Sequence, residues 1–260
     1  MNKLLDVLGT LTYSELKSLW ARHLLWSKEN DRVSGKPKWY DEPGTLNIIG
    51  IRCNSEVDFN YGAYNDYLIL IMNKADGCYD QVIIPVTVDP NHDEYGRGHL
   101  SQGVYDSYCI GIHGLSSGNT STLVAEKKEY IPRYAIRQDR GPVFVTRTDG
   151  KGKVIKREWC MAYINIHDPN KYRDSGIACT VIQTVKLWFY SFLPYIWNYS
   201  SNEIVPSNAA SLVYCLINHT QLETYLGEEL ERVQIAEAIE GEDKSVSIEP
   251  KGATREGVVK

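Results

Sequence analysis

Apolar residues recur at helical spacing near the start of the chain. Within residues 4–28 they form one face that includes Leu16, Leu19, Trp20, His23 and Leu24. Thr12 and Glu15 have the spacing of a capping box, which marks the first turn of a helix. We therefore expect a helix in this region, with His23 as a packed side chain. The polar run 28–44 contains Gly and Pro and predicts a linker.

From residue 46 to about 182 the pattern changes to short β-rich runs separated by turn residues. Such runs, at this spacing, are typical of strands in a mainly antiparallel sandwich or barrel. The chain is therefore predicted to be α+β, with a sandwich-like or barrel-like β domain over residues 45–185. The predicted strands are LNIIGIR, YLILIM, QVIIPVTV, VYDSYCIGI, RYAIR, PVFVTR and WCMAYINI.

After Cys179 the pattern of apolar residues again predicts helices. VIQTVKLWFYSFL predicts a helix that starts near the cysteine and ends at Pro194. SNAASLVYCLINH and QLETYLGEELERVQIAEAI predict two more helices, and residues 241–260 predict a polar tail. The predicted organisation is a helix and linker over 1–44, the β domain over 45–185, helices over 186–240 and the tail.

Composition narrows the classes of function. The net charge of −5 argues against a nucleic-acid partner, because affinity for phosphates depends on Lys and Arg. No run is apolar enough to span a membrane, and the first residues do not resemble a secretion signal. We expect a soluble protein in the cytoplasm where it is made. The 6 cysteines show no CxxC pair, so free thiols are expected.

Candidate chemistry lies in YINIHDPNKYRDSGIACTVIQ, where His167 ends an apolar run and Cys179 begins the next. A thiol becomes a nucleophile as the thiolate, which requires a neighbouring base, cation or helix N-terminus. His167 is the candidate base, and Asn165, Asp168 or a backbone carbonyl could orient its ring. The turn Ser175-Gly176-Ile177-Ala178 could supply backbone N–H groups to an oxyanion.

INIH followed by SGIAC-TVI resembles the active-site signature of L,D-transpeptidase-like (YkuD-fold) proteins, in particular a divergent group encoded by phages. Upstream segments resemble that group in order and spacing over residues 46–183. They are LNIIGIR, the aspartate of YNDYLILI (Asp66), VTVDPN, GVYDSYCIGIHG and YAIRQDRGPVFVTRTDG.

The resemblance implies cysteine-dependent acyl chemistry on peptidoglycan stem peptides, without a metal or other cofactor. Cys179 would be the nucleophile and His167 the base, with oxyanion donors around Ile177 and Ala178. Substrate contacts would come from His113, Gln138 and Arg147. The sequence departs from the family at Ala178, where Gly is usual, and at Ser175, which lies four positions before the cysteine rather than three. These departures leave open a retained fold whose activity is altered or lost.

Two alternatives remain open. One is a virion or tail structural protein that keeps the β fold and docks through its terminal helices; it is compatible with an enzyme made in the host cytoplasm and carried in the particle. The other is a metal-dependent cell-wall peptidase, although no HExxH motif is present and His92 and His99 read as solvated loop residues. Its candidate ligands are His92, Asp93, His99, His113 and His167. Within the thiol mechanism, hydrolysis is favoured over cross-linking because a phage gains more from cutting cell wall.

Overall fold

The computed structural model describes residues 3–53, 64–88, 98–149, 151–169, 179–201, 203–206 and 212–227. The chain divides into two units, residues 1–222 and 223–260, and the description below concerns the first. Its helices are α1 (Lys3–Thr10), α2 (Tyr13–Glu29), α3 (Val185–Leu187) and α4 (Leu193–Ile196), with the π-helical turn η1 (Trp188–Phe192) between the last two.

The described strands number seventeen in chain order. They are β1 (Val33–Ser34), β2 (Leu46–Arg52), β3 (Asp66–Asn73), β4 (Tyr79–Thr87), β5 (Gly98–Leu100), β6 (Gly103–Tyr105), β7 (Tyr108–Ile112), β8 (Ser121–Val124), β9 (Glu129–Pro132), β10 (Tyr134–Gln138), β11 (Val143–Thr148), β12 (Val154–Cys160), β13 (Ile166–His167), β14 (Thr180–Ile182), β15 (Trp197–Ser201), β16 (Glu203–Pro206) and β17 (Leu212–Asn218).

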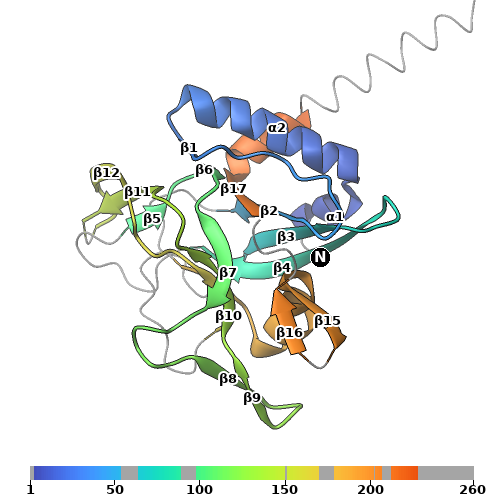
Figure 1. The fold of residues 1–260 in the computed structure, drawn as a ribbon. Coiled ribbons are helices and arrows are strands. Elements are labelled where there is room, and N and C mark those ends of the chain that lie inside the picture. Colours follow the sequence, from blue (N-terminus) through green and yellow to red (C-terminus); the bar gives the residue numbers. More distant parts are fainter. Residues whose placement is uncertain are drawn as a thin grey trace, which may run out of the picture. The chain divides into compact units, whose positions relative to one another are not determined.

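A large curled mixed sheet, resembling half a barrel, forms the centre of the fold (Figure 1). Within the described residues it has ten strands in the order β1-β6-β17-β2-β3-β4-β14-β13-β10-β7. Smaller sheets are formed by β12-β11-β5, β8-β9 and β15-β16. The predicted α+β class is confirmed.

The N-terminal helices follow the local signals of the sequence. The Thr12 hydroxyl accepts a hydrogen bond from the Glu15 N–H, and the Glu15 carboxylate accepts one from the Thr12 N–H, so the predicted capping box is confirmed. Helix α2 contacts β6, β17 and β1, and Figure 1 shows it lying across this end of the sheet. His23 is fully buried on that helix, as expected, and burial lowers its pKa to about 3.

The predicted helix over residues 207–219 was wrong. Residues 212–218 form β17, which pairs in parallel with β2 and antiparallel with β6. The run LVYCLIN is apolar throughout because both faces of this central strand are covered, and such a run cannot be told from a buried helix by its periodicity. Residues 219–227 are helical, and the remainder of the third predicted helix and the tail lie outside the described residues.

Two further boundaries differ from expectation. Residues 180–182 extend the sheet as β14, so the helix begins only at Val185, with the Thr184 hydroxyl as its N-cap. Helical structure continues through Pro194 to Ile196. Before it, the Leu193 N–H donates to the Trp188 carbonyl, which is the bonding pattern of a π-helical turn. The predicted strand WCMAYINI is interrupted, since β12 ends at Cys160 and β13 begins at Ile166.

Candidate active site

Strand pairing places His167 and Cys179 on one face of the sheet. Ile166 pairs in parallel with Thr180, and the Thr180 N–H donates to the Asn165 carbonyl at 2.8 Å. Side chains alternate along strands, so His167 and Cys179 share the face opposite Ile166, which belongs to the hydrophobic core. Their positions, one strand across and two residues along, correspond to about 8 Å between Cα atoms. An imidazole and a thiol that lean toward each other can span this separation.

A short hydrogen bond fixes the tautomer of His167. Its Nδ1 lies 2.6 Å from the carbonyl oxygen of Asp168, which can only accept, so Nδ1 carries the proton. Nε2 is therefore the basic nitrogen. It is buried and has no hydrogen-bond partner among the described residues. Burial, reinforced by the neighbouring His113, lowers the pKa of His167 to about 4 and keeps the ring neutral at pH 7.

His113 completes a stacked pair of imidazoles. Its ring lies parallel to that of His167, with centroids 4.0 Å apart and an interplanar angle of 10°. The Asn165 side-chain oxygen accepts from the Gln138 backbone N–H at 3.1 Å, so the amide nitrogen of Asn165 faces His113 Nδ1, at 3.3 Å. This amide group can only donate, which leaves the His113 proton on Nε2. Asn165 therefore orients His113.

A buried ion pair anchors the residue that orients His167. The guanidinium of Arg133 donates to the Asp168 carboxylate at 2.8 Å, and the two side chains are 1% and 0% exposed. Thr122 of β8 donates its hydroxyl to the second carboxylate oxygen, and Arg133 also donates to the Asn119 carbonyl at 3.2 Å. Asp168 thus orients the imidazole through its main-chain carbonyl, while its carboxylate ties that carbonyl to the hairpin β8-β9.

Cys179 lies under a strained loop. Its side chain is 6% exposed, and its sulfur lies 3.9 Å from the carbonyl oxygen of Tyr163. Tyr163 is 62% exposed and has a φ of 54°, a left-handed conformation that is uncommon for aromatic residues and concentrates at functional sites. Tyr163 lies in the interruption between β12 and β13, and its carbonyl faces the thiol.

The residues expected to contact substrate occupy different environments. Gln138 is fully buried; its amide donates to the carbonyls of Gly141 and Cys160 and accepts from the Ile164 N–H, so it holds the base of the Tyr163 loop. Arg147 lies in the three-stranded sheet, where its guanidinium donates to Glu158 of β12. Of the three, His113 stacks directly on His167.

The oxyanion turn predicted at Ser175, Ile177 and Ala178 lies outside the described residues, as do His92 and Asp93. His99 is fully buried on β5, beside the Thr148 hydroxyl, and not in a solvated loop, because this part of the polar run pairs with β11. The described residues contain no group of three or more His, Cys, Asp or Glu side chains that could hold a metal ion.

Sequence reasoning missed Arg133, Thr122 and Tyr163. The role of Arg133 was only weakly indicated by the sequence. A cation at the start of a predicted strand is normally solvated, and it suggests a buried ion pair only when its carboxylate partner is known. Tyr163 had none, because its backbone conformation cannot be read from its neighbours.

No protein-family model matches the sequence, and no curated protein matches it either. Among the described residues, no helix has both the length and the apolar character needed to cross a membrane.

Proposed function

We propose that the protein carries out cysteine-dependent acyl chemistry on peptidoglycan stem peptides, through an L,D-transpeptidase-like β domain at about residues 45–185. The observation that carries the proposal is the state of His167. Its ring is neutral, its proton is fixed on Nδ1, and its basic Nε2 is buried on the face that Cys179 shares. A general base paired with a thiol needs this arrangement.

The proposed reaction begins when Cys179 gives its thiol proton to His167 Nε2. The thiolate attacks the carbonyl carbon of a stem-peptide amide and forms an S–C bond. As the tetrahedral intermediate collapses, the C–N bond breaks and the leaving amine takes the proton from the imidazolium, which leaves a thioester on Cys179. Water then releases the acid, or an acceptor amine forms a cross-link. Hydrolysis is favoured over cross-linking, because a phage gains more from cutting cell wall.

The environment of His167 suits a base that holds a proton only briefly. Burial and the adjacent His113 both disfavour the imidazolium, which makes the transfer of the thiol proton harder and its later transfer to the leaving amine easier. The Asp168 carbonyl accepts a hydrogen bond from the Nδ1–H group throughout and prevents the ring from turning. Arg133 and Thr122 hold Asp168, and so act as positioning residues in this scheme.

The test uses purified full-length protein and defined muropeptides. We expect an acyl adduct on Cys179 detectable by mass spectrometry, and product release that is lost in Cys179→Ala and retained in Cys215→Ala. A chelator should leave turnover unchanged. Equal turnover by Cys179→Ala would refute the thiol mechanism, and loss of turnover with chelator would favour the metal-dependent alternative.

A second candidate is an assembly protein of a virion that retains the fold without catalysis. The low exposure of Cys179 favours it, because a nucleophile must reach its substrate. In this alternative Cys179 reacts slowly with iodoacetamide and its replacement has no effect in any cell-wall assay, while the terminal helices bind other virion or tail proteins.

A further inference from the structure

A charged hollow of about 320 Å³ lies among the turns at one end of the sheet. It is lined by β1 and the following Gly35, the turn between β6 and β7, the turn between β10 and β11, and Trp159 of β12. At about 30 Å³ for each water in the liquid, its volume corresponds to roughly ten non-hydrogen atoms. A small molecule, or the end of a chain, would fill it.

Small residues keep this hollow open. Gly35 has a φ of 66°, and a Cβ there would lie 3.0 Å from Cβ of Asp106. A Cβ on Gly141 would lie 3.2 Å from the Ser107 hydroxyl. Because a larger residue at either position would crowd a lining side chain, the local sequence preserves both the space and the position of Asp106.

Hydrogen bonds and ring contacts hold the lining in place before any ligand arrives. The Ser34 and Ser107 hydroxyls lie 2.6 Å apart, and Ser107 also donates to the Pro142 carbonyl at 2.9 Å. The Asp106 N–H donates to the Ser34 hydroxyl at 3.1 Å. Trp159 packs edge-on against Phe144, with centroids 5.4 Å apart. A preorganised lining of this kind lowers the entropic cost of binding.

The lining presents one acid, one base and one aromatic surface. Its lining residues include Asp106, Arg140 and Trp159, which is 36% exposed. Burial raises the pKa of Tyr40; Asp106 raises it further, whereas Arg140 lowers it, so both charges act on the same ring. An acid and a base in one lining complement a ligand that carries both an ammonium and a carboxylate.

We propose that the charged hollow binds a small zwitterion, a free amino acid or a dipeptide. Asp106 would accept from the ligand ammonium and Arg140 would donate to its carboxylate, a pairing that charge-assisted hydrogen bonds strengthen. The ligand side chain would lie against Trp159. None of these three groups belongs to the Cys179 site, so the proposal does not depend on the thiol mechanism.

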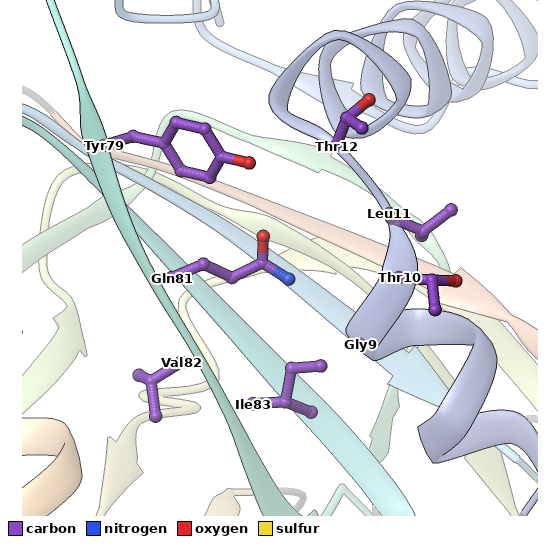
Figure 2. A pocket seen from close by; sticks show the side chains of 8 residues that line it. All are labelled: Gly9, Thr10, Leu11, Thr12, Tyr79, Gln81, Val82 and Ile83. Carbon is purple, nitrogen blue, oxygen red and sulfur yellow. The ribbon is translucent and has the colours of Figure 1, made fainter.

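A larger hollow of about 620 Å³ lies between the α1–α2 turn and β4 and provides a contrast. Figure 2 shows the Gln81 amide reaching from β4 toward that turn. Its hydroxyls already have local partners: Thr10 donates to the Val7 carbonyl, Thr12 bonds to Glu15, and Tyr79 accepts from the Tyr13 N–H. The residues that line it carry no formal charge, so it lacks the recognition elements of the charged hollow.

The test is calorimetric titration of the full-length protein with alanine, in both enantiomers, and with alanyl-alanine. Each is compared with its N-acetyl and its amide derivative. We expect the free zwitterions to bind and the loss of either ligand charge to weaken binding about tenfold or more. Asp106→Asn should remove the preference for the free ammonium, and Arg140→Gln the preference for the free carboxylate.

Asp139→Asn is the matched control, because Asp139 neighbours Arg140 in the chain but pairs with Arg137 and does not line the hollow. Circular dichroism and thermal unfolding establish that each variant is folded. The proposal is overturned if the free zwitterions do not bind at millimolar concentration, if blocked derivatives bind equally well, or if Asp139→Asn weakens binding as much as Asp106→Asn. Preferential binding of N-acetylglucosamine would overturn it in favour of a saccharide site.

Discussion

Two buried cysteines in the same sheet have contrasting environments. Cys215 lies in the middle of β17, between Ile49 of β2 and Val104 of β6, and is fully buried. Burial raises the pKa of its thiol well above the usual range, which keeps it protonated. Cys179 immediately precedes β14, retains 6% exposure, and shares a face with His167. Residue type and burial alone therefore do not separate the two thiols; under the proposed function, His167 distinguishes Cys179 as the reactive one.

The largest expected contrast is in alkylation. Cys179 should react with iodoacetamide about a thousandfold faster than Cys215, or more, because Cys215 becomes accessible only when the sheet opens. Peptide mapping by mass spectrometry after timed quenching gives both rates in one sample. Comparable alkylation rates would show that Cys179 is no more reactive than Cys215 and would support the non-catalytic alternative.

Replacing the proposed base should make the reactivity of Cys179 more like that of Cys215. In His167→Gln the alkylation rate of Cys179 at about pH 7 should fall by about 100-fold to 10,000-fold, the range typical of a positioned general base. The rate should then rise with pH as for an unassisted thiol. The Cys215 rate serves as the internal control for folding, and an unchanged Cys179 profile would show that His167 does not assist it.

The Arg133–Asp168 pair tests whether positioning matters. Arg133→Met leaves a carboxylate buried without its partner, which should cost about 3–5 kcal/mol in the free energy of unfolding. Arg133→Met with Asp168→Leu should recover much of that loss. Urea titration measures both, and a loss below about 1 kcal/mol in the single variant would contradict a tightly held pair.

The smallest effect is the acid dependence of stability. The folded-state pKa of His167 is about 4 against an ordinary 6.5, so between these values the unfolded chain binds more protons. Stability should therefore be complete above about pH 6.5 and fall as the pH drops toward 4, by about 3 kcal/mol from this residue. His23 acts in the same direction. Urea titrations from about pH 7 to 5 should show a shallower dependence in His167→Gln; an equal dependence would contradict the assignment.

Strands with clear turn residues at their ends were predictable from the sequence. LNIIGIR matches β2 residue for residue, and the Thr12 cap is present as expected. The run containing Cys215 was misread as a helix because a central strand covered on both faces has no alternation. His99 was misread because the polarity of its neighbours gives no indication of pairing with β11.

The candidate site was only partly predictable, for a similar reason. The sequence indicated a strand that ends at His167, a connection, and a second apolar run that begins at Cys179. These elements were enough to predict that the two residues approach each other. The orienting group could not be chosen, since Asn165, Asp168 and a carbonyl were equally available in the sequence. The choice depends on Arg133 and Thr122, which lie far from Asp168 along the chain and approach it only through β10 and the hairpin β8-β9.

The position of β17 has a consequence for biosynthesis. Strand β2 leaves the ribosome long before its parallel neighbour β17, and β6 also pairs with that later strand. Until residue 218 has been synthesised, two strands of the nascent chain each present an open edge. The assembly of the central sheet is therefore a late event dominated by contacts distant in sequence, which is typical of slow folding and of dependence on chaperones.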